Sequence, residues 1–111
     1  MDDLDQEDAK LATLARSARA RTQASEGAAV RDTDGRTYAA CTVQLPSFSV
    51  TAMQAAVIAA VSSGAEGIEA AVIVTEFPGV SSASVSAVRD LNRQAPIYLV
   101  DPSGAVMDRL P

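Results

Sequence analysis

The run from Ala70 to Val74 constrains the fold most, because it is short and apolar at every position. Alternate side chains of a strand point to opposite faces, so a continuously apolar strand is typical of the centre of a sheet covered on both sides. The sequence therefore predicts a sheet with helices packed against each of its faces.

Three segments have the features of helices. Leucines and alanines at helical spacing predict a helix over residues 4–22, with Asp2, Asp3 and Asp5 placed where carboxylates favour a helix start. Residues 50–61 are apolar on almost every side, which predicts a buried helix that Ser49 or Thr51 caps and Gly64 ends. A third helix is predicted over residues 81–93.

Further strands are expected on either side of these helices. Residues 27–30 and 36–43 are predicted to form an antiparallel hairpin around a turn at 32–35. Pro46 and its serines indicate a loop, residues 96–100 another strand, and 105–110 a short closing element after a turn at 101–104. The order α-β-β-α-β-α-β predicts a single domain over residues 1–111, a three-layer α/β/α sandwich with a mixed sheet.

Composition restricts the partners that the chain can have. Its aromatic content is 4% and it contains 22 alanines, so each side chain buries little area and a homo-oligomer is expected. A net charge of -5 argues against nucleic-acid binding, and the cluster of Arg16, Arg19 and Arg21 is interpreted as a solvated helix face. The short apolar runs predict no membrane span. The acidic start and the lone Cys41 predict a cytoplasmic protein.

The segments and their order resemble the cytidine deaminase family over about residues 10 to 110. Gly27–Val30 with Asp34–Tyr38 is similar to that family's opening hairpin, and Ala55–Gly64 to its buried helix. Pro96–Gly104 is similar to its late strand and turn. The resemblance implies a cytidine deaminase-like fold, in which zinc is held at two helix starts by a Cys/His-x-Glu motif and a Pro-Cys-x-x-Cys motif.

The zinc machinery of that family has no counterpart in this chain. Thr51 and Met53 stand at the first motif, and Ser81 and Ser84 stand at the ligand positions of the second. The chain has no histidine and one cysteine, so these ligands cannot be supplied from elsewhere in it. Neutral hydroxyls are poor zinc ligands. Where the family holds a ribose with Asn-x-Glu, this chain has Thr42 and Gln44.

Each of these residues also has a structural interpretation. Ser81, Ser82, Ser84 and Thr51 either cradle an anion or simply cap helices. Met53 either lines an apolar pocket or fills the core. Cys41 lacks a histidine to activate it and is interpreted as a small buried hydrophobe.

The remaining carboxylates are interpreted in the same way. The pairs Glu66 with Glu69 and Asp32 with Asp34 fall in apparent loops or turns and are interpreted as solvated surface. Asp101 follows a strand end, where it either meets a ligand or forms a turn. No catalytic residue, metal ligand or cofactor-binding residue is therefore predicted.

Two hypotheses follow for function. The first is a catalytically inactive cytidine deaminase-like protein, a structural or regulatory homo-oligomer or the partner of another protein. The second is a module that binds a nucleoside, nucleotide or anion in a vestigial pocket made of Thr42, Gln44, Thr51, Met53, Ser81 and Ser84.

Overall fold

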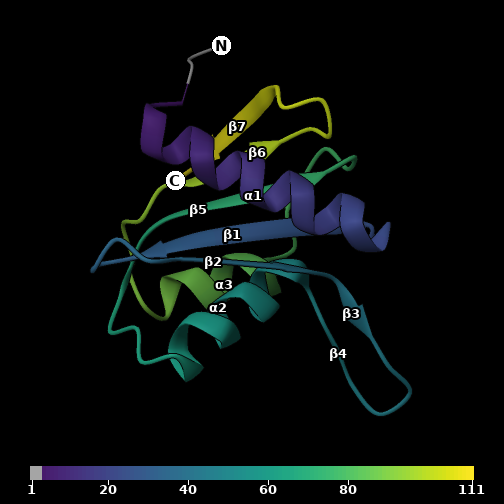
Figure 1. Cartoon of the computed structure of the whole chain (residues 1–111), viewed down its shortest axis with the longest axis horizontal. Helices are drawn as coiled ribbons and strands as arrows, with labels where there is room; N and C mark the ends of the chain where they lie inside the picture. Colours follow the sequence, from purple (N-terminus) through teal and green to yellow (C-terminus); the bar gives the residue numbers. More distant parts are fainter. Residues whose placement is uncertain (1–3) are drawn as a thin grey trace.

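The computed structural model describes residues 4–111 and has a five-stranded mixed sheet at its centre (Figure 1). The helices are α1 (Gln6–Thr22), α2 (Ala52–Ser62) and α3 (Ser82–Arg89). The sheet strands are β1 (Glu26–Asp32), β2 (Thr37–Cys41), β5 (Ile68–Thr75), β6 (Ile97–Val100) and β7 (Val106–Leu110). A separate two-stranded hairpin consists of β3 (Val43–Gln44) and β4 (Ser49–Val50).

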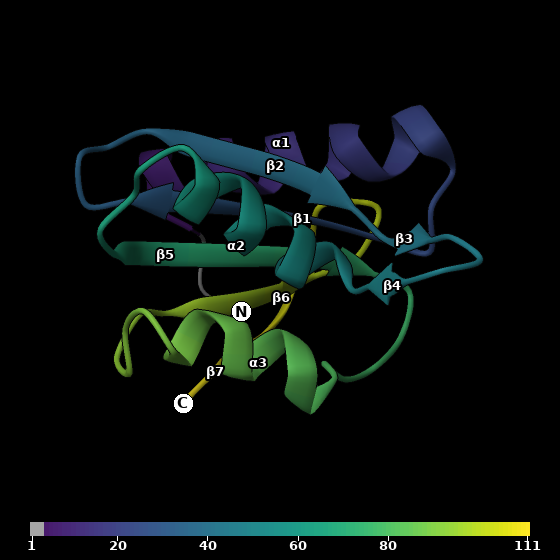
Figure 2. The same ribbon diagram turned by 90° about the horizontal axis from the view of Figure 1, so that it is seen from below.

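The strands lie in the order β2-β1-β5-β6-β7, with β5 and β6 parallel and the other neighbours antiparallel. Helix α1 covers one face of the sheet, and α2 and α3 cover the other (Figures 1 and 2). The prediction of a three-layer α/β/α sandwich with a mixed sheet is therefore confirmed. Within residues 4–111 no helix has the length and apolar character needed to cross a bilayer.

Strand β5 lies at the centre of the sheet, as its apolar run predicts. Ala71 and Ile73 pack into the core beneath α2 and α3, whereas Ala70, Val72 and Val74 pack into the core beneath α1. One strand therefore supplies both layers of the core, which explains why it has no polar position between Ala70 and Val74.

The predicted helices form with shifted limits. Asp5 caps α1 by accepting a hydrogen bond from the Asp8 N–H at 2.8 Å, while Asp2 and Asp3 lie outside the described residues. Thr51 caps α2, and Gly64 beyond its end has the positive φ that a helix terminus favours. Helix α3 ends at Arg89, four positions before the predicted end at residue 93.

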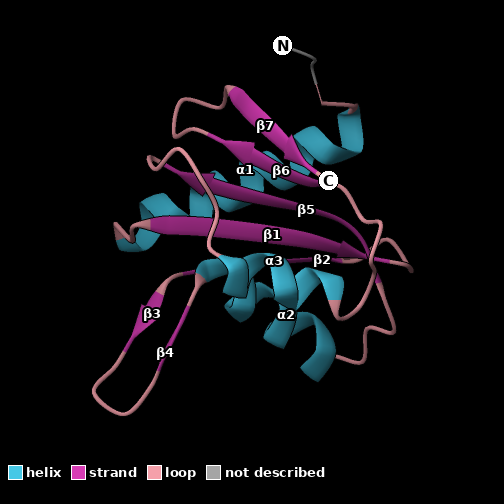
Figure 3. Cartoon of the chain, turned by 180° about the vertical axis from the view of Figure 1, so that it is seen from behind, coloured by secondary structure: helices cyan, strands magenta, loops and turns pink. Residues whose placement is uncertain are grey.

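Two predicted segments carry more structure than expected, and one prediction about the elements is wrong. The loop expected around Pro46 connects β3 and β4, which form the small hairpin that projects from the sheet (Figure 3). The closing element is a full strand, β7, paired with β6. Helix α2 is not buried on every side, because Ile58 and Val61 are 55% and 49% exposed. The sheet covers one side of α2, and α3 covers only one flank of it. The apolar pattern therefore overestimates how much of α2 is covered.

Candidate functional site

The starts of α2 and α3 meet through a chain of three hydroxyl groups. The Ser81 hydroxyl donates to Ser84 Oγ at 3.0 Å, and the Ser84 hydroxyl donates to Thr51 Oγ1 at 2.9 Å. Ser84 is only 1% exposed, so the link between the two helices is shielded from solvent. Two segments far apart in the sequence are thereby joined at their helix starts.

Each end of this chain is also a helix cap. Thr51 Oγ1 accepts from the Gln54 N–H at 3.1 Å, and Gln54 Oε1 accepts from the Thr51 N–H at 2.9 Å, which completes a capping box. Ser81 Oγ accepts from the Ser84 N–H at 3.2 Å. The capping interpretation of Thr51 and Ser81 is therefore confirmed, and the same hydroxyls also connect the helices.

An open depression of about 350 Å³ lies beside the hydroxyl chain. Four of the residues that the sequence singles out line it: Thr42, Gln44, Thr51 and Ser81. Ser84 is not among the lining residues but bonds to two of them. The structure therefore brings these five residues to one place.

Met53 is the exception among the predicted pocket residues. It is 0% exposed and belongs to the core cluster between the sheet and α2. Of the two interpretations of Met53, core filling is the one that this position supports.

Thr42 and Gln44 differ in how free they are to bind. Thr42 Oγ1 accepts from the Glu26 N–H at 3.2 Å and from the Ser25 hydroxyl at 3.4 Å, so it is held against the start of β1. Gln44 lies on β3 and is exposed. The exposed Gln44 side chain can therefore reorient, whereas the Thr42 hydroxyl is already engaged.

The depression contains functional groups that sequence analysis missed. Glu26 brings a carboxylate from the start of β1, Gln54 brings an amide from α2, and Phe77 brings an aromatic ring from the loop after β5. The Thr42 N–H donates to the Glu26 carbonyl oxygen at 3.1 Å, which ties the two strands together beside the depression. In the observed register Gly27 pairs with Cys41, which sets Glu26 opposite Thr42, and the predicted hairpin was the signal that could have identified Glu26.

The donor set at the two helix starts does not fit zinc. Protein zinc sites use thiolate, imidazole or carboxylate, and here Thr51, Ser81 and Ser84 present neutral hydroxyls bonded to one another. Across residues 4–111 no group of three or more His, Cys, Asp or Glu side chains is arranged to hold a metal ion. Cys41 lies on β2, half-buried, and does not line the depression.

The interpretation of Asp32 as solvated surface is wrong. Asp32 ends β1, is 1% exposed, and accepts hydrogen bonds from the N–H groups of Asp34 and Arg36 and from the Tyr38 hydroxyl. Burial by itself raises the pKa of Asp32, but these hydrogen bonds outweigh it and lower the pKa below its ordinary value. Asp32 therefore organises the β1–β2 turn.

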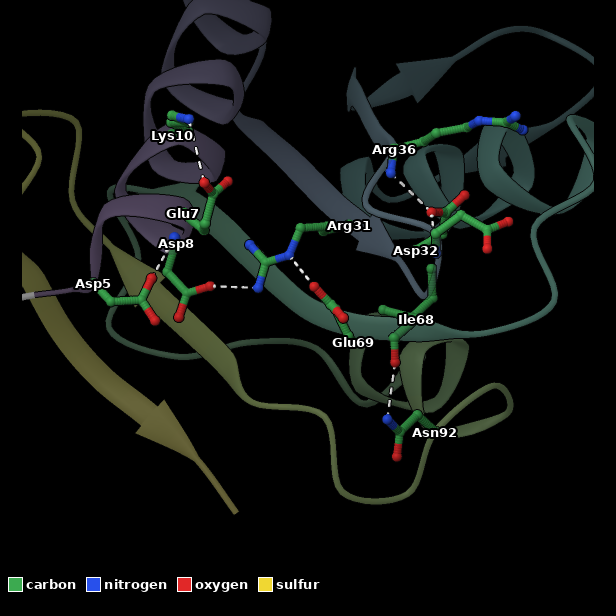
Figure 4. A network of polar contacts seen from close by, with 11 residues as sticks. Asp5, Glu7, Asp8, Lys10, Arg31, Asp32, Arg36, Ile68, Glu69 and Asn92 are labelled. Carbon is green, nitrogen blue, oxygen red and sulfur yellow. Dashed lines mark hydrogen bonds and ion pairs between the residues drawn. The ribbon is translucent and has the colours of Figure 1, made fainter.

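The location of Glu69 in a loop is also wrong. Glu69 lies on β5 and forms an ion pair with Arg31 Nε, while Asp8 of α1 pairs with Arg31 Nη2 at 3.0 Å (Figure 4). Burial by itself lowers the pKa of Arg31, but the two carboxylates raise it above its ordinary value. Asp8, Arg31 and Glu69 thus form an ion network between α1 and the sheet.

Of the two interpretations of Asp101, the structure supports turn formation. Its carboxylate accepts from the Ser103 hydroxyl at 2.6 Å, the Ser103 N–H at 2.9 Å and the Ala105 N–H at 3.0 Å. These hydrogen bonds, that of the Ser103 side chain first, lower the pKa of Asp101. The carboxylate is therefore occupied within the β6–β7 turn.

Comparison with known proteins agrees with this architecture. The family model described as cytidine deaminase-like matches residues 4–104. A cytidine deaminase crystal structure from Burkholderia pseudomallei superposes with a TM-score of 0.78 at 21% identity, covering 91% of this chain and 89% of that one. The cytidine deaminase from Mycobacterium leprae gives a TM-score of 0.67 at 17% identity, covering 95% of each chain. No curated protein sequence matches the chain. The chain belongs to the cytidine deaminase-like family.

Proposed function

We propose that this chain is a cytidine deaminase-like protein without deaminase activity, which acts as a structural or regulatory homo-oligomer. The hydroxyl chain from Ser81 through Ser84 to Thr51 carries the proposal. It links the two helix starts through neutral groups that neither hold zinc nor transfer a proton to substrate at neutral pH. In this view Thr42, Gln44, Thr51, Met53, Ser81 and Ser84 are the remnant of a former pocket.

Ammonia release from cytidine tests the loss of activity. The purified chain, supplied with zinc in excess, is expected to release none above the uncatalysed background. A zinc-loaded deaminase of known activity, assayed in parallel, shows that the conditions permit the reaction. Ammonia released in proportion to the concentration of this chain would contradict the proposal.

The distribution of charge supports self-association. Residues 37–65, which include β2, the β3–β4 hairpin and α2, contain no Asp, Glu, Lys or Arg although the chain has a net charge of -5. Within this uncharged segment Leu45, Phe48, Ile58 and Val61 are exposed. Contact between two copies through it buries apolar surface without desolvating any charge of that segment.

A groove of about 380 Å³ on this side of the molecule offers the surface for such contact. Its lining residues are Val50, Gln54, Val57, Ile58, Val61, Ala87, Asp90 and Leu91, of which only Asp90 is charged. Exposed apolar surface of this kind is typical of interaction sites. The partner in the proposal is a second copy of the chain, and another protein with an uncharged apolar surface is the alternative.

Sedimentation velocity tests the oligomer. The wild-type chain is expected to sediment as a dimer or larger species, and Ile58→Glu is expected to sediment as a monomer, because it places a charge in the groove. Gln6→Glu adds the same charge at an exposed position on α1 and is expected to leave the oligomer intact. A monomeric wild type, or equal dissociation by both variants, would count against the proposal.

A second candidate function is binding of a small molecule in the depression beside the hydroxyl chain. Its lining includes Glu26 and no Lys or Arg, which favours an uncharged nucleoside over a nucleotide or a simple anion. Phe77 offers an aromatic surface to a base, and Gln44 and Gln54 offer amide groups to sugar or base.

A thermal-shift screen separates this candidate from the first. Cytidine and uridine are expected to raise the unfolding temperature, whereas inorganic phosphate is not. The double variant Ser81→Ala/Ser84→Ala is expected to abolish the increase, while Ser86→Ala, an exposed serine on the same helix, preserves it. A screen without any stabilising nucleoside would remove this candidate.

Neither a cofactor nor a nucleic-acid partner is part of this function: neutral hydroxyls at the helix starts are poor zinc ligands, and a chain with a net charge of -5 repels nucleic acid. Cys41, the one cysteine, has no disulfide partner, which suits a reducing compartment such as the cytoplasm.

A further inference from the structure

The side of the sheet covered by α1 has a second, basic depression of about 290 Å³. It lies where α1, the carboxyl end of β5 and the β6–β7 turn meet. Its lining residues are Thr13, Arg16, Ser17, Arg19, Ala20, Val74 and Pro102. It shares no residue with the depression beside the hydroxyl chain, so what it binds is independent of the function proposed above.

Arg16 is held in place by backbone, although the sequence suggested a freely solvated side chain. Its Nε–H donates to the Pro102 carbonyl oxygen at 3.2 Å. Its guanidinium also lies over Gly104, where an added Cβ would come within 3.1 Å of Nη1. Within residues 4–111 no carboxylate forms an ion pair with Arg16. Its terminal nitrogens are therefore oriented and free to donate to a ligand.

Arg19 supplies a second positive charge to the same depression. Its Nε–H donates to the Ser25 carbonyl oxygen at 3.3 Å, and its Nη2 pairs with Glu76 Oε1 at 3.3 Å. The Glu76 side chain is 71% exposed, so this pair is weak and an incoming anion can replace Glu76. Ser17 adds a hydroxyl to the depression, which can donate to the same anion.

The Asp101 carboxylate, next to the lining residue Pro102 in the chain, pairs with neither Arg16 nor Arg19 within residues 4–111. The Asp101 carboxylate is directed at Ser103 and the Ala105 N–H within the β6–β7 turn. Val74, Ala20 and Pro102 form the apolar part of the lining. Apolar walls strengthen the attraction between an arginine and an oxyanion, because they exclude water from one side of the pair.

We propose that this depression is a binding site for a phosphate group, held by the guanidinium of Arg16 with Arg19 and the Ser17 hydroxyl in support. Arginine donates two parallel N–H groups, which match two oxygens of a phosphate. The volume of about 290 Å³ accepts a phosphate group with a small organic substituent. Inorganic phosphate and a small phosphomonoester share the chemistry that the site recognises.

The test is an NMR titration of the full chain at pH 7 and constant ionic strength. Sodium phosphate is expected to shift the Arg16 and Arg19 Nε–H signals and the Ser17 and Ala20 amides along a saturable curve. Glycerol phosphate in place of inorganic phosphate shows whether the substituent adds affinity, and sodium acetate tests for carboxylate binding. Shifts that rise linearly without saturation, or tighter binding of acetate than of phosphate, would overturn the proposal.

Variants separate this site from a general effect of charge. Arg16→Gln is expected to weaken phosphate binding at least tenfold and Arg19→Gln severalfold. Glu76→Gln is expected to strengthen it, because Arg19 loses its competing partner. Arg93→Gln removes the same charge from an exposed position outside the depression and is expected to change affinity less than twofold. Equal weakening by Arg16→Gln and Arg93→Gln would refute a defined site.

Discussion

The two faces of the sheet stabilise their helices with different chemistry. On the α1 face, charges cross from helix to sheet: Asp8 and Glu69 hold Arg31, and Arg16 and Arg19 reach backbone carbonyls. On the other face, α2 carries no charge and is joined to α3 by neutral hydroxyls. The α1 face is built from directional polar contacts, whereas the α2 and α3 face combines a small hydroxyl cluster with apolar surface that is left exposed.

Gly27→Ala is expected to disrupt the packing of α1 against β1 and to have the largest effect on stability. An added Cβ at Gly27 would lie 2.1 Å from the Ala15 carbonyl oxygen, which belongs to the helix backbone and cannot rotate away. We expect a loss of stability beyond the range of about 1–3 kcal/mol that is usual for overpacking. Urea denaturation measures it. Gly79→Ala is the control, because a Cβ there meets no atom within 4 Å, and an equally large loss in the control would contradict the account.

Met53→Ala tests the core of the opposite face. Met53 is fully buried, so truncation is expected to cost about 3 kcal/mol through lost burial and an unfilled cavity. Met107→Ala, at a partly buried methionine on β7, is expected to cost less. If Met53→Ala has no effect on stability, Met53 does not fill the core in solution and lies in an open pocket instead.

Ser84→Ala tests the link between α2 and α3. The variant removes the hydrogen bond to Thr51 and the one from Ser81, and we expect it to lower stability by about 1 kcal/mol. Ser86→Ala, on the exposed side of α3, is expected to change stability by less than about 0.5 kcal/mol. Identical midpoints of urea denaturation for Ser84→Ala and Ser86→Ala would show that the hydroxyl chain does not stabilise the packing of α2 against α3.

The smallest expected effect is a dependence on pH at the β1–β2 turn. The pKa of Asp32 is lower in the folded chain than the ordinary pKa of an aspartate, so its carboxylate stabilises the fold at pH values above that ordinary pKa. This contribution is lost as pH falls through the folded pKa. Asp32→Asn is therefore expected to be less stable than wild type at pH 7. The difference in free energy of unfolding between the two should become smaller below about pH 4. Asp34→Asn, at an exposed position, serves as the control. If urea denaturation gives the same difference in free energy of unfolding from pH 7 to pH 2, this role of Asp32 is contradicted.

Patterns of local chemistry predicted much of this molecule. The apolar run at Ala70–Val74 identified the central strand, because a strand covered on both faces has no place for a polar residue. Capping was one of the two interpretations of Thr51 and Ser81, and both residues cap their helices in the structure, because a hydroxyl at a helix start accepts from a free backbone N–H. These predictions depend only on residues that are close in sequence, and a local sequence pattern includes all of them.

What sequence analysis missed depends on partners distant in sequence. Asp32 is buried because Tyr38 and two backbone donors satisfy it, and a turn motif gives no sign of that partner across the hairpin. Glu69 meets Arg31 because β5 pairs with β1 in the sheet, and the sequence does not state which strands are neighbours. Ile58 is exposed because nothing in residues 4–111 covers the outer side of α2, and hydrophobic periodicity cannot state what covers a helix.

Mass spectrometry of the chain purified from zinc-supplemented medium measures directly whether the two helix starts hold zinc. We expect less than about 0.1 zinc per wild-type chain, because the hydroxyls of Thr51, Ser81 and Ser84 are poor ligands. A triple variant, Thr51→Cys/Ser81→Cys/Ser84→Cys, provides the positive control, since these hydroxyls already converge and thiolates in their place should take up about one zinc. One zinc per chain in the wild type would contradict the claim that this site lacks the chemistry of its family.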